Sequence, residues 1–289
     1  MTTPLKSNIL LAYPNMTDSA TLSGGTWQIP LNRLQDRRLT RVARTANCTP
    51  ASTMFVADLG KPTKLTMVDI VRHNMTTLGK WRVTLSNAAD FSTVEFSSDW
   101  IKAWPVLFSP DSLEWEDDNW WEGTVSEADR AGYPGLLFVQ LPRIFLCRYV
   151  RIEFNDPLNP AGYLEFGRLF LASSWQPALN MDYGNSLAWE FTSTKSTAAL
   201  GGTQYFDRRA GKRVLRFTLS NLTPEEALSK IFEMQRVLGA DGEVLVMANP
   251  TDLLNVLRQS FIGRLRQVSP LTMASFRRFG TPFEIEELL

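Results

Sequence analysis

The feature that most limits the fold is a series of short runs in which apolar and polar residues alternate, each bounded by turn-forming residues. In the run RYVRIEF, Val150, Ile152 and Phe154 share one side of an extended chain, and Tyr149, Arg151 and Glu153 share the other. A period of two residues is typical of a strand with one buried face. Comparable β-rich runs span residues 53–58, 65–72, 80–86, 135–141 and 165–172. Short strands separated by turns predict an antiparallel β-sandwich in the first half.

A change in composition near residue 175 divides the chain. Its 289 residues are too many for one ordinary domain, and eight of the nine tryptophans precede residue 176. The segment SSWQPA at 173–178 contains Ser and Pro, which interrupt regular structure. We therefore expect a jelly-roll β-sandwich over residues 1–175 and a second domain over residues 176–289.

The second domain is predicted to be a small α+β fold, which makes the whole chain mostly β. Thr223 as N-cap, Pro224 in the first turn and Glu226 form a capping-box pattern, and Gly239 marks the helix end. Between them, residues at helical spacing predict one main helix: Ala227, Leu228, Ile231, Phe232, Gln235 and Leu238. The predicted strands around it span residues 213–219, 242–247, 260–265 and 282–288.

The scarcity of histidine limits the chemistry. His73 is the only imidazole, so a Ser–His–Asp triad, a Cys–His pair or a multi-histidine metal site would depend on this one residue. It ends an apolar stretch, and we expect a strand-end histidine bonded to the backbone. No phosphate-binding glycine motif is present, and only hydrolysis by paired carboxylates stays open. We therefore predict no enzyme, no cofactor and no metal.

Charge, hydropathy and cysteine content indicate which kinds of partner and which cellular compartment this protein can have. Thirty basic and thirty acidic residues give a formal charge of zero, which argues against sequence-specific nucleic-acid binding. The apolar runs are far shorter than the roughly 20 residues that span a bilayer, and the N-terminus lacks a signal-peptide core. Cys48 and Cys147 are expected to be free thiols in a protein made in a reducing compartment.

The first half resembles the jelly rolls of discoidin-like domains and carbohydrate-binding modules. The likeness rests on CRYVRIEFNDPLNPAGYLEFGRLFLA at 147–172, NILLAYPNMTDSATLSGGTW at 8–27 and VDIVRHNMTTLGKWRVTLS at 68–86. It covers about residues 8 to 173. Domains of this kind bind sugars, lipids, proteins or nothing, so the resemblance implies a topology more than a ligand.

An acidic, tryptophan-rich segment is the main candidate for binding. Residues 111–122 hold six carboxylates and three tryptophans without one basic residue. The tryptophans could stack on sugar rings, and an oxygen-rich loop suits Ca²⁺, although the spacing is not that of an EF-hand. We favour packing of the tryptophans on their own domain or on a neighbouring subunit, and at a protein interface the arginines of residues 33–44 would supply the opposite charge in the same or the next subunit. The alternative is that both segments are solvated and never meet. The candidates for a ligand or an interface are Trp115, Trp120, Trp121, Glu116, Asp117, Asp118, Arg37 and Arg38.

The second half resembles tail-tube-like domains of tailed bacteriophages. The order of motifs is similar: an RxxxF strand, a capped amphipathic helix, a GxxxVxxxxP run, FIGRL and a terminal FEIEE. This resemblance implies a distal-tail or tail-hub-like structural protein of the virion tail tip or baseplate, made in the bacterial cytoplasm. It would form a ring, trimer or hexamer, around the tail channel and link the tube to host-recognition proteins. The jelly roll comes first here, whereas distal tail proteins usually place the ring domain first.

Ring formation gives testable expectations. Unpaired sheet edges invite aggregation, and pairing between identical subunits removes them. Glu284 and Glu286 are expected to face a polar lumen or solvent, while Phe283 and Ile285 meet the 224–238 helix. The ring-assembly candidates are Val214, Arg216, Phe217, Phe261, Phe283, Glu284, Ile285 and Glu286. The partners would be further copies, other tail proteins and a host-surface glycan. The alternative is a free-standing carbohydrate-binding protein that uses the jelly roll.

Overall fold

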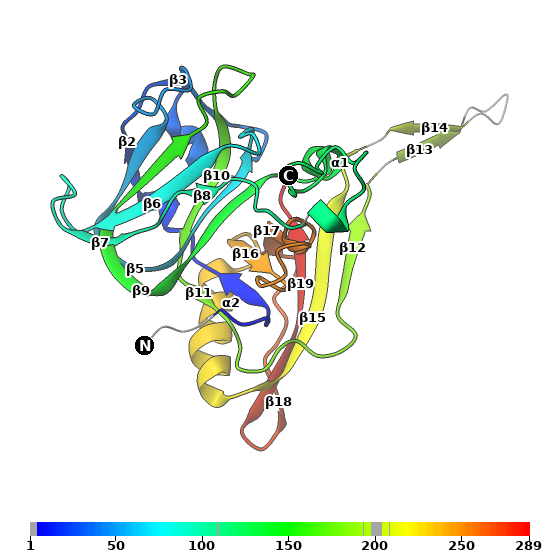
Figure 1. The fold of residues 1–289 in the computed structure, drawn as a ribbon. Helices are drawn as coiled ribbons and strands as arrows, with labels where there is room; N and C mark the ends of the chain where they lie inside the picture. The colour runs from blue at the N-terminus through cyan, green and yellow to red at the C-terminus, as the bar shows by residue number, and fades with distance from the viewer. Residues whose placement is uncertain (1–4, 109, 193, 198–203, 208) are drawn as a thin grey trace. The chain divides into compact units, whose positions relative to one another are not determined.

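The computed structural model describes residues 5–108, 110–192, 194–197, 204–207 and 209–289 (Figure 1). The chain is mostly β with antiparallel sheets and few helices, which confirms the predicted fold class. Contacts divide it into two compact units. Unit 1 comprises Met1–Gln176 and Val244–Phe261, and unit 2 comprises Pro177–Glu243 and Ile262–Leu289.

A nine-stranded antiparallel sheet dominates unit 1. Its strands follow the order β3-β4-β10-β5-β9-β6-β7, with β2 on β5 and β8 on β6. The bounds are β2 (Thr21–Ser23), β3 (Trp27–Ile29), β4 (Ala43–Thr45), β5 (Met54–His73), β6 (Lys80–Ser86), β7 (Val94–Ser97), β8 (Ile101–Lys102), β9 (Leu136–Asn155) and β10 (Glu165–Ala172). A smaller antiparallel group holds β1 (Leu10–Ala12), β11 (Ser174–Trp175) and β16 (Glu243–Met247).

Two long strands replace four of the predicted short ones. β5 joins the runs 53–58 and 65–72, and β9 joins 135–141 and 148–154. The pairing of β5 with β9 shifts register between Asp58 and Thr63 and again between Leu65 and Met67. Such irregularities bend a strand. One continuous, bent strand can therefore contain two runs that the sequence predicts as separate strands. β6 and β10 keep the predicted bounds of residues 80–86 and 165–172.

An aromatic core fills the sandwich. Phe154 of β9 and Phe166 of β10 stack with ring centroids 4.0 Å apart, and Phe55 of β5 lies 6.1 Å from Phe154. Trp81 of β6 is fully buried. Phe154 lies on the face predicted to point inward together with Val150 and Ile152, and all three are buried. Burial of large rings supplies most of the free energy that holds a sandwich together.

Short helices lie in the connections between the strands of unit 1. The bounds are η1 (Met16–Ser19), η2 (Leu31–Gln35), η3 (Pro110–Ser112), α1 (Glu127–Gly132) and α3 (Val256–Gln259). Asn15 caps η1, because its side chain accepts a hydrogen bond from the Thr17 amide.

Unit 2 is built on an antiparallel sheet of order β17-β19-β15-β12, with β18 on β19. The bounds are β12 (Ser186–Glu190), β15 (Lys212–Leu222), β17 (Ser260–Leu265), β18 (Thr272–Ser275) and β19 (Arg278–Glu287). A further hairpin pairs β13 (Thr194–Thr197) with β14 (Gln204–Asp207) and extends beyond β12 and β15 (Figure 1). Sequence patterns had indicated neither this hairpin nor β12 and β18.

The main helix begins and ends where the sequence predicted. Thr223 and Glu226 form the capping box: Thr223 Oγ1 accepts from the Glu226 amide at 3.3 Å, and Glu226 Oε2 accepts from the Thr223 amide at 3.0 Å. Gly239 ends the helix with a φ of +57°. The winding differs from expectation, because η4 (Glu226–Phe232) is a π-helix between the α-helical residues 224–225 and α2 (Glu233–Leu238).

The π-helical turns change which side chains are buried. Ala227, Ile231 and Leu238 are buried as predicted. Leu228 and Phe232, which share the predicted helical spacing, are instead more than half exposed, at 53% and 54%. A wider turn rotates successive side chains by less than the α-helical 100°, which moves this apolar pair out of the buried face.

Within the described residues, no helix is long and apolar enough to cross a membrane.

Candidate functional site

The acidic tryptophan segment of unit 1 presents its rings to solvent. Trp115 and Trp121 are 73% and 81% exposed, whereas Trp120 is half-buried between them. Trp120 meets Trp121 edge to face at 4.5 Å between centroids, and Trp115 meets Trp120 in the same manner at 6.3 Å. Three connected rings therefore form one apolar patch, which is the kind of surface that marks binding.

Internal hydrogen bonds give this segment a defined shape. Asp117 accepts from the Glu114 amide at 2.9 Å, and Asp118 accepts from the Glu127 amide at 2.6 Å. The buried Asn119 side chain donates to the Thr124 carbonyl at 2.6 Å. Hydrogen bonds between side chains and backbone groups thus fix the loop that carries the patch.

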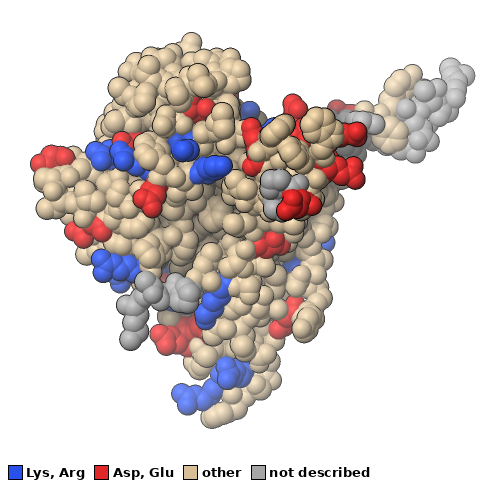
Figure 2. Space-filling view, in the orientation of Figure 1, with Lys and Arg blue, Asp and Glu red and all other residues tan. Residues whose placement is uncertain are grey.

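Six exposed carboxylates surround the tryptophans, and acidic side chains gather over the part of the molecule that carries α1 (Figure 2). They are Asp111, Glu114, Glu116, Asp117, Asp118 and Glu122. In the described part of the chain, none of them forms an ion pair with Lys or Arg. The segment therefore displays negative charge around an apolar centre.

In the arginine-rich stretch of residues 33–44, two arginines bond the side chain of Asp36. Asp36 receives a bidentate pair from Arg38 at 3.0 and 2.9 Å, and Arg41 reaches it at 3.3 Å. The hydrogen bonds from Arg38 hold the pKa of Asp36 well below its ordinary value despite opposing desolvation. Arg44 instead bonds Glu165 at 2.5 Å, and Arg37 is exposed in the same turn as Arg38. Among the residues that the structure describes, no ion pair joins this stretch to the acidic segment.

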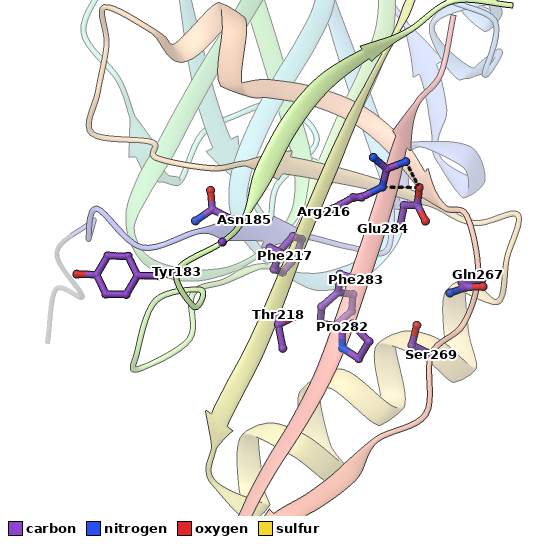
Figure 3. Close-up of a pocket in the computed structure, with 11 residues that line it drawn as sticks. Tyr183, Asn185, Arg216, Phe217, Thr218, Gln267, Ser269, Pro282, Phe283 and Glu284 are labelled. Carbon is purple, nitrogen blue, oxygen red and sulfur yellow. Dashed lines mark hydrogen bonds and ion pairs between the residues drawn. The ribbon is translucent and has the colours of Figure 1, made fainter.

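A hollow of about 230 Å³ lies on unit 2 (Figure 3). Phe217 and Phe283 stack at 4.9 Å beside the ion pair of Arg216 with Glu284, whose shortest distance is 2.8 Å. The Tyr183 side chain stands fully exposed at its border. The other lining residues are Gly184, Asn185, Thr218, Gln267, Ser269 and Pro282. Aromatic rings beside hydrogen-bonding groups suit an amphipathic ligand or a partner side chain.

The residues predicted to assemble the ring fall into a buried apolar group and a group that forms ion pairs. Five are buried in the chain's own core: Val214, Phe217, Phe261, Phe283 and Ile285. The other three, Arg216, Glu284 and Glu286, belong to a set of ion pairs across β15, β19 and β17.

Opposite charges balance on this face of the sheet. Arg266 bonds both Glu190 and Glu284 at 2.9 Å, and Arg264 reaches Glu286 at 2.6 Å. Bonds from Arg266 and Arg216 lower the pKa of Glu284. Glu286 is buried and pairs with Arg264, whereas Glu284 is half-buried, so Glu286 does not face open solvent as expected. A lumen beside Glu284 stays a prediction.

His73 lies at the end of β5, as predicted; the residue is half-buried, and its Nε2 atom is buried without a hydrogen-bond partner among the described residues. Its Nδ1 accepts a hydrogen bond from the Met75 amide at 3.2 Å, and its ring lies 5.0 Å from Trp104. Desolvation lowers the pKa of His73 to about 3, so the ring is neutral at physiological pH. Among the residues that the structure describes, no group of three His, Cys, Asp or Glu could hold a metal ion.

Exposed apolar side chains on unit 2 form a second candidate surface that sequence reasoning missed. Trp189 of β12 stacks on Phe191 at 6.2 Å, and Tyr205 and Phe206 of β14 are more than half exposed. β12 is an edge strand that pairs with β15. The alternation in SLAWE at 186–190 was the available signal, but the run is too short to stand out.

Comparisons with known proteins found structures but no family. No protein-family description and no curated protein matches the chain. Among solved structures, the lectin domain of lectinolysin bound to Lewis b antigen shares 16% identity and a TM-score of 0.36, covering 57% of this chain and 98% of that domain. The family 32 carbohydrate-binding module of Clostridium perfringens NanJ, in complex with galactose, shares 13% and 0.35, covering 57% and 99%. The C. perfringens module CpGH89CBM32-6 shares 15% and 0.33, covering 55% and 99%. These neighbours are carbohydrate-binding modules or lectin domains.

Proposed function

We propose that this protein is a structural protein that assembles with copies of itself through unit 2. The observation that carries the proposal is the exposed edge of β12, where Leu187 and Trp189 are both more than 40% exposed and Phe191 follows directly. An edge strand offers unpaired backbone groups, and an apolar edge is a hazard in a chain that stays single. Pairing with a second copy covers both.

The hairpin of β13 and β14 supports the same proposal. It continues the pairing of β12 with β15, because Glu190 lies opposite Lys212 and Thr194 lies opposite Asp207. A two-stranded ribbon without a third strand is only marginally stable in water. Exposed Tyr205 and Phe206 give it apolar surface that a neighbouring subunit would cover.

The finer proposal is a role in the tail tip or baseplate of a bacteriophage virion. It rests on the resemblance of residues 180–289 to tail-tube-like domains. The balanced ion pairs of Arg216, Glu284 and Arg266 suit the wall of a channel for nucleic acid, because a neutral polar wall does not hold phosphates as a cationic one would. In this role the subunits form a closed ring of three or six.

Sedimentation of the purified full chain tests assembly. Wild type should sediment as a closed oligomer at micromolar concentration, and L187K/W189K should shift it to monomer. Leu158→Lys is the matched control, because Leu158 is an exposed apolar residue on a turn of unit 1. A wild type that stays monomeric, or an edge variant that assembles like wild type, overturns the proposal. Electron microscopy of the oligomer then shows whether it is a ring.

A second candidate function is glycan binding by unit 1. The observation that favours it is the exposure of Trp115 and Trp121 beside carboxylates, since sugars stack on aromatic rings and donate hydroxyl hydrogen bonds. Titration with galactose and with fucosylated oligosaccharides tests it by calorimetry. Binding that Trp121→Ala abolishes supports this function, and no heat change up to millimolar sugar removes it.

A further inference from the structure

We infer that the tryptophan patch of one copy docks on the arginine cluster of another copy. The tryptophan patch comprises Trp115, Trp120 and Trp121 with the carboxylates of residues 111–122, and the arginine cluster comprises residues 33–41. Both surfaces belong to unit 1. The inference rests on the proposed self-assembly and adds a second contact to it.

The tryptophan patch and the arginine cluster carry opposite charges, which favours a second copy of this chain as the partner. Residues 111–122 carry six carboxylates and no base, whereas residues 33–41 carry four arginines and one aspartate, a formal charge of +3. Arg37, Arg38 and Arg41 are exposed. Opposite surfaces of this size attract over a distance of about a Debye length and repel their own kind.

Chemical fit supports the pairing. Arginine guanidinium groups are planar and stack on tryptophan faces while they bond carboxylates, so one arginine can satisfy both parts of the patch. A neutral sugar would occupy the rings but leave six like charges uncompensated.

Both surfaces are preorganised. Asp36 holds Arg38 and Arg41 together, and Asp117 and Asp118 fix the loop that presents the tryptophans. Preorganised groups lose less conformational entropy on binding than flexible ones. Neither surface satisfies the other within the chain, since the loop carboxylates form no ion pair in the described residues while Arg38 and Arg41 pair with Asp36.

The two surfaces differ, so their contact is heterologous and joins copies head to tail. It therefore adds to the edge contact of unit 2 rather than replacing it. Because it depends on ion pairs, it should weaken with salt, whereas the apolar edge contact should persist.

Charge reversal with mixing tests the inference. One variant carries Arg37→Glu and Arg41→Glu, and the other carries Glu114→Lys and Glu116→Lys. Each alone should sediment as a smaller species than wild type at 50 mM NaCl, because the first sets like charges against each other and the second lowers the formal charge of residues 111–122 from −6 to −2. An equimolar mixture should recover association, since the unchanged acidic patch of the first variant meets the unchanged arginine cluster of the second.

Controls separate this contact from the assembly proposal. Reversal of Lys61 and Lys64, two exposed lysines on unit 1, should leave sedimentation unchanged. Circular dichroism checks that each variant is folded, and the loss of large species from wild type between 50 and 500 mM NaCl is a readout that needs no variant.

Four outcomes decide the matter. Recovery in the mixture supports the contact. A wild-type oligomer that neither reversal nor salt affects overturns it and leaves assembly through unit 2 standing. A monomeric wild type overturns both. Glycan binding that Trp121→Ala abolishes, with sedimentation unchanged in every reversal variant, assigns the patch to sugar and also overturns the contact.

Discussion

Arg213 and Glu287 form a buried ion pair between β15 and β19, with each side chain only 3% exposed. Glu287 Oε2 accepts from Arg213 Nε at 2.9 Å and from the Arg213 amide at 3.0 Å, and Oε1 bonds the guanidinium as well. The carboxylate thus satisfies both the side chain and the backbone of its partner. Because the charges compensate each other away from water, the loss of either one leaves a buried charge.

Glu287→Gln is therefore expected to lower the free energy of unfolding of unit 2 by about 3 kcal/mol. Urea denaturation, followed by far-UV circular dichroism at pH 7, measures this change. Glu233→Gln is the matched control, because Glu233 pairs with Arg236 on an exposed helix surface and should cost less than about 1 kcal/mol. Equal losses in the two variants would contradict the buried pair.

Asp69→Asn is expected to stabilise the protein at neutral pH. Asp69 is fully buried in β5, neither carboxylate oxygen has a hydrogen-bond partner, and burial raises its pKa well above the ordinary value. A raised pKa favours folding below the unfolded value near 3.8, and this stability is lost as the pH rises through the folded value. The stability gain of the variant should therefore grow from pH 4 to pH 8 in urea denaturation. A constant difference between the two proteins would show that Asp69 does not titrate on unfolding.

His73 gives the opposite dependence on pH. Its pKa is lowered to about 3 by burial, so the neutral ring stabilises the fold above the unfolded value near 6.5. That stability is lost as the pH falls from 6.5 toward 3. His73→Gln should show a weaker loss of stability between pH 7 and pH 4.5 than wild type. The imidazole resonances of the wild type, followed by NMR, should not shift above pH 4.5, and a midpoint near 6.5 would refute the burial.

Thr223→Ala tests the helix start. Desolvation alone would raise the pKa of Glu226, but hydrogen bonds from the Ala178 and Thr223 amides and the Thr223 hydroxyl outweigh it and lower the pKa. Removal of the hydroxyl takes one bond from Glu226 and leaves its amide without the cap, at a cost of about 1 kcal/mol. Thermal unfolding measures the loss, and Thr223→Ser should recover most of it.

The last part of β9 could be predicted from alternation alone, because only one face of it is fully buried. Val150, Ile152 and Phe154 show this directly. β10, by contrast, is buried on both faces and was evident from its β-rich composition. The continuity of β5 could not be predicted, since the bend near Gly60 depends on register with β9. The helix ends were predictable from Thr223 and Gly239, as caps are local, but its π-helical winding was not.

The candidate surfaces show the same division. The tryptophan patch was evident from composition, because three tryptophans and six carboxylates in twelve residues are visible in the sequence. The ion pairs of Arg38 and Arg41 with Asp36 were not evident from the sequence, although the three residues lie within six positions. The folded chain could equally have brought other carboxylates to those arginines. The exposure of Trp189 could not be predicted from the short alternating run around it, since it depends on β12 being an edge strand.

The π-helical turns of η4 give the main helix a place where chain length can vary. An α-helix advances 3.6 residues per turn, and a wider turn takes up an additional residue without lengthening the helix in proportion. A chain with one residue fewer between Glu226 and Phe232 could keep both the cap at Thr223 and the end at Gly239. Leu228 and Phe232 would then turn toward the core, and the apolar ridge they now expose would disappear. The outer face of this helix could thus change by deletion of one residue, while the strands of unit 2 stay where they are.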